Sequence, residues 1–312
     1  MRLACVSIFA LGLAACGSES QTQPEPTDAR LVVSEQEIPE ASDSAPSYQT
    51  VTSVLDAPWR SEGNRARDEW RNPAETLDFF DIDPSGTVME IWPGGGWYTD
   101  IIAPWTGANG GTYVAGWPPV DPTNDRAVEF RDRFLAKFEQ DGFPEPVLAP
   151  AGPDGIVLPD GVRPDAIVTF RNTHSFMSRG AAEAMYAHFF DALTPGGVLG
   201  VVQHRLPADV EQDPRVSTGY LQEDIVRALA EGAGFVFEEA SEINANPADT
   251  ADHPFGVWTL PPVGRTSAFG EPANPDFDRA PFDAIGESDR MTLRFRKPAT
   301  PVETETEAEG EE

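Results

Sequence analysis

The sequence predicts an α/β domain built around a mainly parallel sheet. Between residues 49 and 298, apolar segments of strand length alternate with amphipathic segments of helix length. Three glycines at positions 94 to 96 directly follow the first apolar segment of this series, as expected for a turn between a strand and a helix. No internal repeat is visible. We therefore expect a single folded domain over 49–298.

Five segments have the pattern of amphipathic helices. Trp70, Leu77 and Phe80 share one side of the first helix, which Pro73 interrupts. Aromatic and leucine side chains recur at helical spacing in the third, and Gly234 follows the fifth as a stop signal. The predicted helices cover residues 64–80, a segment that begins at 99–105, and residues 124–140, 181–193 and 221–233.

Seven shorter apolar segments predict the strands. Glycine and proline bound several of them, as in the turn at 194–197 that precedes the fifth strand. The last segment alternates apolar and polar residues, which is typical of a strand with one buried face. The predicted strands cover residues 87–92, 111–116, 146–150, 165–170, 198–203, 235–239 and 291–295.

The charge balance excludes one class of function. The chain of 312 residues has 52 acidic residues against 22 Lys and Arg, a formal net charge of −30. Nucleic-acid binding needs a basic surface, and no Lys/Arg-rich run occurs, so we expect no nucleic-acid partner. Residues 17–48 and 299–312 are acidic and poor in aromatic residues, which predicts a disordered Pro/Ser-rich tether and a disordered Glu-rich tail.

The first residues have the pattern of a bacterial lipoprotein signal. Arg2 precedes an apolar run over 3–13 that is too short to span a bilayer. The chain then reads Leu-Ala-Ala-Cys-Gly, which resembles the lipobox, where the cysteine becomes the lipidated first residue. We therefore predict a signal peptide over 1–16, lipidation of Cys16, and a periplasm-facing outer-membrane lipoprotein of the bacterial cell envelope. The alternative is a buried N-terminal helix with two incidental thiols.

One stretch resembles the first motif of a known enzyme family. Residues 88–99 read Val-Met-Glu-Ile-Trp-Pro-Gly-Gly-Gly-Trp-Tyr-Thr, an acidic residue at a strand end followed by a glycine turn. This is similar to class I S-adenosylmethionine-dependent methyltransferases. The order of the later motifs adds specificity, with Leu-Thr-Pro-Gly-Gly at 193–197 before a strand, Ala-Gly-Phe at 233–235, and a final strand that leads into Lys297.

More closely, the chain resembles a group of predicted methyltransferases of bacterial envelopes. In that group, Arg-Asp-Glu-Trp-Arg-Asn-Pro, here residues 67–73, precedes the glycine motif. Arg-Asn-Thr-His, here 171–174, follows the fourth strand, and Gln-His-Arg, here 203–205, follows the fifth. The resemblance covers essentially the entire folded part of the chain.

The resemblance implies both a fold and an activity. The fold is a Rossmann-like, seven-stranded, mostly parallel sheet with helices on both faces, the class I methyltransferase fold. The activity is methyl transfer from S-adenosylmethionine to a small or envelope-associated acceptor, by a monomer. By the family's pattern, the residues that bind the cofactor are Glu90, Pro93, Gly94, Gly95, Gly96, Trp97 and Asn172.

A second set of polar residues follows two neighbouring strands. In the methyltransferase strand order the fourth and fifth strands are adjacent, about 5 Å apart, so residues after them meet at the edge that carries the glycine turn. A histidine can accept a proton near neutral pH, and an arginine can hold a carboxylate or phosphate. We predict His174 as general base, His204 as its partner or a substrate ligand, and Arg171 and Arg205 as anion holders. The alternative is a polar cluster that only ties loops together.

The loop over 244–252 is a further candidate. Its Asp249 and the following His253 favour turns, with an acceptor lid or a metal site as the alternatives. Tyr220 and Glu223 are expected to close the pocket from the other side. We predict no metal ligand.

Two departures from the family's pattern define three hypotheses. Trp92 stands where the usual motif has glycine, and the second strand ends without the acidic residue that commonly holds the ribose. A methyltransferase requires room for the donor beside Trp92. An exported, non-catalytic binding lipoprotein that has lost the donor requires only a pocket near Arg171 and His174. A metal-dependent hydrolase would require a carboxylate within reach of both His174 and His204.

Overall fold

The computed structural model describes residues 47–299. The predicted signal peptide, the lipidation site at Cys16, nearly all of the tether and nearly all of the Glu-rich tail lie outside these residues. The helices and strands begin at Val51 and end at Arg296. Within the part of the chain that the structure describes, no helix has the length and apolar character needed to cross a membrane.

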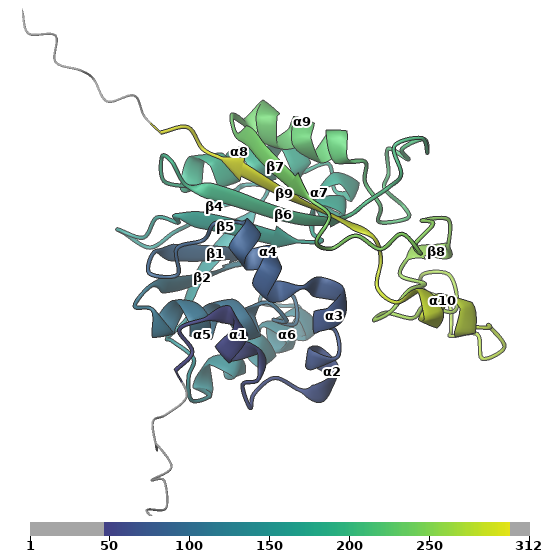
Figure 1. The fold of residues 1–312 in the computed structure, drawn as a ribbon, viewed down its shortest axis with the longest axis horizontal. Coiled ribbons are helices and arrows are strands. Elements are labelled where there is room, and N and C mark those ends of the chain that lie inside the picture. The colour runs from purple at the N-terminus through teal and green to yellow at the C-terminus, as the bar shows by residue number, and fades with distance from the viewer. Residues whose placement is uncertain (1–46, 300–312) are drawn as a thin grey trace, which may run out of the picture. The chain divides into compact units, whose positions relative to one another are not determined.

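An eight-stranded sheet forms the centre of the domain, in the order β4-β3-β2-β1-β5-β6-β9-β7 (Figure 1). Apolar residues fill β1, β5 and β6, which are buried on both faces. The strands of the sheet are β1 (Thr87–Ile91), β2 (Thr112–Trp117), β3 (Val147–Gly152), β4 (Gly155–Ile156), β5 (Ala166–Phe170), β6 (Val198–His204), β7 (Val236–Ser241) and β9 (Arg290–Arg296).

The direction and order of these strands confirm the predicted fold class. β1, β2, β3, β5 and β6 run parallel, whereas β9 runs antiparallel to both β6 and β7. The chain moves outward from β1 through β2 to β3 and then returns to the other side of β1 at β5. All seven predicted strands are present in the sheet, which also contains the unpredicted two-residue β4, an antiparallel hairpin partner of β3.

Helices cover both faces of the sheet (Figure 1). On one face α1, α4, α5 and α6 enclose an apolar core that includes Leu77 and Ile101. On the other, α7, α8 and α9 enclose a core that includes Phe189 and Val226. The helices are α1 (Val51–Leu55), α2 (Glu62–Arg65), α3 (Asp68–Arg71), α4 (Pro73–Phe79), α5 (Thr99–Ala108), α6 (Asp125–Leu135), α7 (Thr173–Ser178), α8 (Ala182–Ala192), α9 (Glu223–Ala233) and α10 (Ala280–Ile285).

The helix predicted over 64–80 is instead three short helices, α2, α3 and α4. Asn72 adopts a left-handed backbone conformation with φ of 38°, which ends α3. Pro73 then supplies the first residue of α4, where its missing N–H has no helical partner to lose. As a result α3 turns away from α4, and its arginines point toward the carboxyl ends of the strands.

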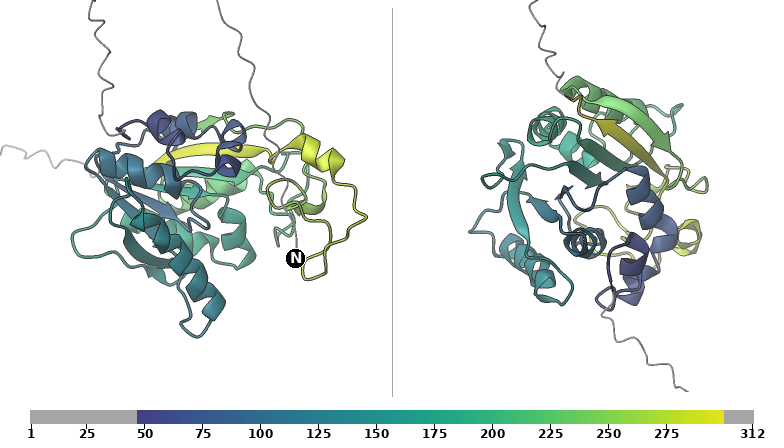
Figure 2. Two further views of the ribbon diagram at one scale, coloured as in Figure 1. Left: turned by 90° about the horizontal axis from the view of Figure 1, so that it is seen from below. Right: turned by 60° about the vertical axis from the view of Figure 1, so that its left-hand side comes forward.

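The segment between β7 and β9 covers the carboxyl ends of the central strands. It contains β8 (Pro254–Val257) and α10, neither of which was predicted. Figure 2 shows α10 and the loop before it projecting beyond the end of the sheet. Because β1, β5 and β6 are parallel, their carboxyl ends meet at one edge, and this segment lies against that edge.

Two glycines of this fold predict opposite effects of the same substitution. A Cβ on Gly200, in the middle of β6, would lie 2.5 Å from the ring of Phe80, whereas a Cβ on Gly232, inside α9, would meet nothing within 4 Å. We expect Gly200→Ala to lower the free energy of unfolding by about 1–3 kcal/mol through overpacking. Gly232→Ala should raise it by about 0.5–1 kcal/mol, because alanine favours the helix. Urea denaturation of both variants measures this, and a destabilised Gly232→Ala would contradict it.

Candidate functional site

A cavity of about 390 Å³ lies at the carboxyl ends of β1, β5 and β6. This is the place where the strand order changes direction, and open α/β sheets bind ligands at such a crevice. Its walls come from the turn after β1, the residues after β5, the end of β6, α3, the loop after β8 and the residues before β9. We call it the switch-point pocket.

The glycine turn forms one open wall of this pocket. Gly94 has a φ of 60°, which favours glycine, and a Cβ on Gly94 or Gly95 would meet nothing within 4 Å. Gly96 faces away, since a Cβ there would lie 2.9 Å from the side chain of Lys137. Pro93 and Trp97 line the pocket beside the two open glycines.

Trp92 closes the pocket on the side of β2 and β3. Its backbone has a φ of 46°, the conformation that the usual glycine would adopt without strain. Its indole Nε1 donates a hydrogen bond of 2.9 Å to the carbonyl oxygen of Ala151 in β3. The ring packs edge-on against Phe176 at 4.7 Å, and the guanidinium of Arg179 lies 5.4 Å from it. The indole therefore bridges from the end of β1 to the end of β3.

Glu90, predicted to bind the donor, points away from the pocket into the core. Its carboxylate accepts hydrogen bonds of 2.7 Å from the hydroxyls of Thr99 and Tyr113. Burial raises the pKa of Glu90 to about 7, although these two hydrogen bonds oppose the shift. The prediction of a donor-binding Glu90 is thus wrong for this structure, because the side chain faces the helices that cover the sheet.

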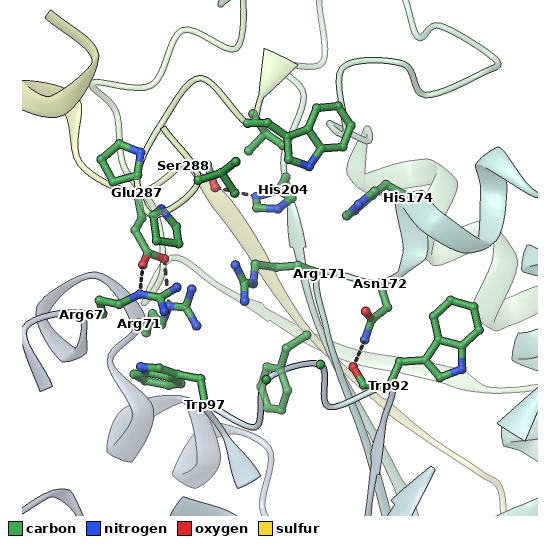
Figure 3. Close-up of a pocket in the computed structure, with 18 of the residues that line it drawn as sticks. Arg67, Arg71, Trp92, Trp97, Arg171, Asn172, His174, His204, Glu287 and Ser288 are labelled. Carbon is green, nitrogen blue, oxygen red and sulfur yellow. Dashed lines mark hydrogen bonds and ion pairs between the residues drawn. The ribbon is translucent and has the colours of Figure 1, made fainter. Parts of the chain in front are cut away.

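Three arginines and one carboxylate form the polar end of the pocket (Figure 3). The Nε atoms of Arg67 and Arg71 donate to Glu287 at 2.7 and 2.9 Å. Arg71 is 1% exposed and lies 4.6 Å from the ring of Trp97, and no described residue forms a hydrogen bond with its Nη1 or Nη2. Arg171 extends from the end of β5 toward this pair.

The charges of this cluster interact strongly. Burial raises the pKa of Glu287, but the neighbouring arginines, Arg71 foremost, outweigh it and hold that pKa at about 2. Burial lowers the pKa of Arg171 to about 10. Burial also holds the pKa of Arg71 well below the ordinary arginine value. Arg171 contributes to that lowering, so the two guanidinium groups repel each other across the pocket.

The two histidines lie together, as predicted, with ring centroids 5.6 Å apart. Gln203 Nε2 donates to the carbonyl oxygen of Gly219 and lies 3.3 Å from Nδ1 of His174. The neutral tautomer that this network selects therefore carries its proton on Nε2. Burial lowers the pKa of His174 to about 4, so the ring is neutral at pH 7. His174 offers the pocket a hydrogen-bond donor, which does not suit the predicted role of general base.

His204 lines the pocket at the end of β6. Its Nδ1 shares a hydrogen bond of 2.6 Å with the hydroxyl of Ser288, and burial holds its pKa well below the ordinary histidine value. Arg205, the next residue, does not line the pocket. Its guanidinium pairs with Glu242 and Asp289, both within 2.8 Å at the nearest atoms. The prediction of Arg205 as an anion holder is wrong, because these carboxylates already occupy it.

Asn172 lines the pocket but also ties the strand ends together. Its Nδ2 donates to the carbonyl oxygen of Ile91 at 2.8 Å, which fixes the turn after β1 to the residues after β5. Predicted site residues that line the pocket are Pro93, Gly94, Gly95, Trp97, Arg171, Asn172, His174 and His204. Those outside it are Glu90, Gly96 and Arg205.

Sequence reasoning missed Arg67, Arg71 and Glu287. A signal existed for the two arginines, because Arg67 and Arg71 belong to the segment 67–73 that the sequence analysis singled out and stand four residues apart, which places them on one side of a helical turn. Nothing in the sequence indicated Glu287, which meets them from more than 200 positions away.

The loop after β7 has a structural role. Asp249 is buried, pairs with His253 at 2.7 Å, and accepts hydrogen bonds from the hydroxyl of Tyr220. None of these three residues lines the switch-point pocket. Within residues 47–299 no group of three or more His, Cys, Asp or Glu has a metal-binding arrangement, and His174 and His204 have no carboxylate placed to share a metal with them.

S-adenosylmethionine, the donor that the resemblance implies, fits the pocket at one end only. Gly94 and Gly95 offer an open wall, and the unpartnered Nη atoms of Arg71 suit the carboxylate of its methionine part. The indole of Trp92, bonded to Ala151, would leave the nucleoside part little room on the side of β3, and β2 ends in Trp117 with no acidic side chain for the ribose. The residues as placed do not hold the entire donor.

Comparisons with known proteins give similarity in fold. No family model matches the sequence, and no curated protein matches it either. A SAM-dependent methyltransferase from Aquifex aeolicus is 19% identical, with 62% of this chain and 93% of that chain covered and a TM-score of 0.46.

Two further solved structures are similar at lower identity. The N-methyltransferase NodS from Bradyrhizobium japonicum WM9, in complex with S-adenosyl-L-homocysteine, is 13% identical over 81% of this chain and 100% of that chain, with a TM-score of 0.43. A TehB-like SAM-dependent methyltransferase from Corynebacterium glutamicum is 16% identical over 74% and 96%, with a TM-score of 0.40. Likeness at these identities concerns the fold alone.

The environment of Glu90 predicts how its replacement affects stability. With a pKa raised to about 7 from 4.5, the folded protein keeps a proton that the unfolded chain releases, so this group costs stability as the pH rises from 4.5 through 7. Glu90→Gln removes that cost. Relative to wild type, the variant should gain on the order of 3 kcal/mol between pH 4.5 and pH 8 in urea denaturation. A difference that does not change with pH would contradict this.

Proposed function

We propose that this chain is a methyltransferase that uses S-adenosylmethionine and acts on a small-molecule acceptor in the switch-point pocket. The observation that carries the proposal is the arrangement of that pocket. An open glycine turn after β1 faces nitrogen donors that follow β5, at the crevice where sheets of this kind bind ligands. The class I methyltransferase fold supports the reaction type without establishing it.

In this proposal Trp92 moves when the donor binds. The indole is held by one hydrogen bond to Ala151, worth about 1 kcal/mol, by its edge contact with Phe176, worth about 0.5–1.5 kcal/mol, and by the guanidinium of Arg179, worth about 0.5–1 kcal/mol. Interactions of this size are within what a bound nucleoside can offset. Removal of the indole from the end of β3 opens the wall on that side of the glycine turn.

The chain's own residues then have the following tasks. Gly94 and Gly95 would let the donor approach the backbone, and Arg71 holds an acidic group of the acceptor. His174 orients the acceptor through Nε2–H, while His204, also neutral, is the histidine left to accept a proton from it. When bound, S-adenosylmethionine supplies the methyl group.

A second candidate function is a non-catalytic ligand-binding protein with a methyltransferase fold. The observation that favours it is the anchoring of Trp92 to Ala151, Phe176 and Arg179, together with the missing acidic residue at the end of β2. For this candidate, the arginines and histidines of the pocket bind the ligand, and no donor binds at the glycine turn.

The proposed place of action follows from the sequence. We propose that the protein is anchored by a lipid on Cys16 as a monomeric lipoprotein of the bacterial envelope, on the periplasmic side of the outer membrane. The pocket would then meet small molecules or envelope components outside the cytoplasm. Metabolic labelling with a radioactive fatty acid, compared between wild type and Cys16→Ser, tests the anchor, and equal labelling would contradict it.

Calorimetric titration with S-adenosylmethionine and S-adenosylhomocysteine separates the two candidates. We expect both to bind the full-length chain in the micromolar range. Trp92→Gly should bind about tenfold more tightly, because the indole no longer has to be displaced. Gly95→Trp should abolish binding, because a Cβ there meets nothing within 4 Å and the indole would fill the open wall.

If neither wild type nor Trp92→Gly binds either compound at millimolar concentration, the methyltransferase proposal is wrong. The pocket is then that of a non-catalytic ligand-binding protein. Circular dichroism of all three proteins controls for misfolding.

A further inference from the structure

The switch-point pocket is cationic in a strongly anionic protein. Its charged lining residues are Arg67, Arg71, Arg171 and Glu287, which sum to a net charge of +2 because both histidines are neutral. The chain as a whole carries −30. A positive cavity inside such a chain does not arise from general composition, so a specific ligand is the simplest reason for it.

Arg71 provides the strongest evidence for a missing acceptor. It is 1% exposed, and both terminal nitrogens lack a hydrogen-bond partner among the described residues. Leaving buried donors of a charged group unpaired costs free energy, and native proteins rarely tolerate it. A guanidinium that only joined α3 to the residues before β9 would need no more than its Nε contact with Glu287.

Glu287 positions the arginines and leaves their binding edges open. It accepts from Nε of both Arg67 and Arg71, so the paired Nη groups that usually grip an oxyanion remain unused by it. No other carboxylate lines the pocket. Glu287 also pairs with Arg290, outside the pocket, so this one acid gathers the arginines and leaves the pocket with a net positive charge.

Arg171 adds a third guanidinium at a cost to the backbone. Its φ of 62° is a left-handed backbone conformation that residues other than glycine rarely adopt. Its positive charge also repels that of Arg71. Figure 3 shows its guanidinium extending toward Arg67 and Arg71, with no hydrogen bond or ion pair to the residues drawn. An arginine that strains the backbone and repels its neighbour contributes little to folding, which points to a role with a ligand.

Part of the remaining lining is apolar. The loop after β8 contributes Val257, Trp258, Pro261, Pro262 and Val263, and His174 lies 6.0 Å from the ring of Trp258. The pocket therefore combines a cluster of cationic donors with side chains that suit a non-polar body.

We propose that the pocket recognises a small molecule that carries a carboxylate or phosphate on an apolar body, with the oxyanion held by Arg67, Arg71 and Arg171. As a statement about the methyl acceptor, this inference rests on the proposed function. As a statement about the pocket, it is testable without a donor.

Calorimetric titration of the full-length chain tests the inference with three probes. Benzoate presents a carboxylate on an apolar ring, phenyl phosphate presents a phosphate on the same ring, and inorganic phosphate has no apolar body. We expect benzoate or phenyl phosphate to bind, and the tighter of the two identifies the oxyanion. Inorganic phosphate should bind at least about tenfold more weakly than phenyl phosphate.

Three variants locate the binding. Arg71→Met and Arg171→Gly should each weaken the better probe at least about tenfold, whereas Arg205→Met, outside the pocket, should leave its affinity unchanged. Arg171→Gly also separates function from folding, because glycine relieves the left-handed backbone and the repulsion of Arg71. Its melting temperature should stay level or rise while its affinity falls, even if Arg71→Met fails to fold.

Two results would overturn the inference. One is no binding by any probe, or binding that Arg171→Gly leaves intact. The other is loss of probe binding when S-adenosylhomocysteine occupies the protein, which would assign the arginines to the donor's own carboxylate. If the probe binds and S-adenosylhomocysteine does not bind at all, the inference about the pocket stands and the methyltransferase proposal fails.

Discussion

The buried carboxylate of Glu287 is the interaction on which the pocket depends. It joins Arg67 and Arg71, near the start of the folded chain, to the residues that lead into β9 near its end. Arg290 also pairs with it and donates to the carbonyl oxygen of Trp70. Without this acid, the guanidinium groups would repel one another at short distance, and the bond from Arg290 to Trp70 would be left to hold α3 to β9.

The fold and the lining of the pocket differ in how closely they match a donor-binding enzyme. The strand order, the glycine turn and the position of the cavity agree with the class I methyltransferase fold, whereas the indole of Trp92 closes the pocket on the side of β3. Both the left-handed Trp92 after β1 and the left-handed Arg171 after β5 stand at the pocket. Strain concentrated at the ends of these two strands is typical of a functional site, since folding alone gives no reason to keep it.

The sequence predicted the sheet well because parallel strands buried on both faces are nearly continuous apolar runs. It also predicted that residues after β5 and β6 meet, since adjacent parallel strands end at one edge. The sequence did not predict which of these side chains point into the pocket. Neighbouring residues of an extended chain project to opposite sides, so His204 reaches the pocket and Arg205 does not, and Glu90 faces the core. Glu287 was missed because only the folded chain brings it to α3.

A crystal structure of the chain grown with S-adenosylhomocysteine and phenyl phosphate would test the account most directly. The account predicts the nucleoside at the end of β3, the indole of Trp92 displaced from Ala151, and the phosphate against Arg71 and Arg171. An indole still bonded to Ala151, with no ligand against the glycine turn or the arginines, would contradict it.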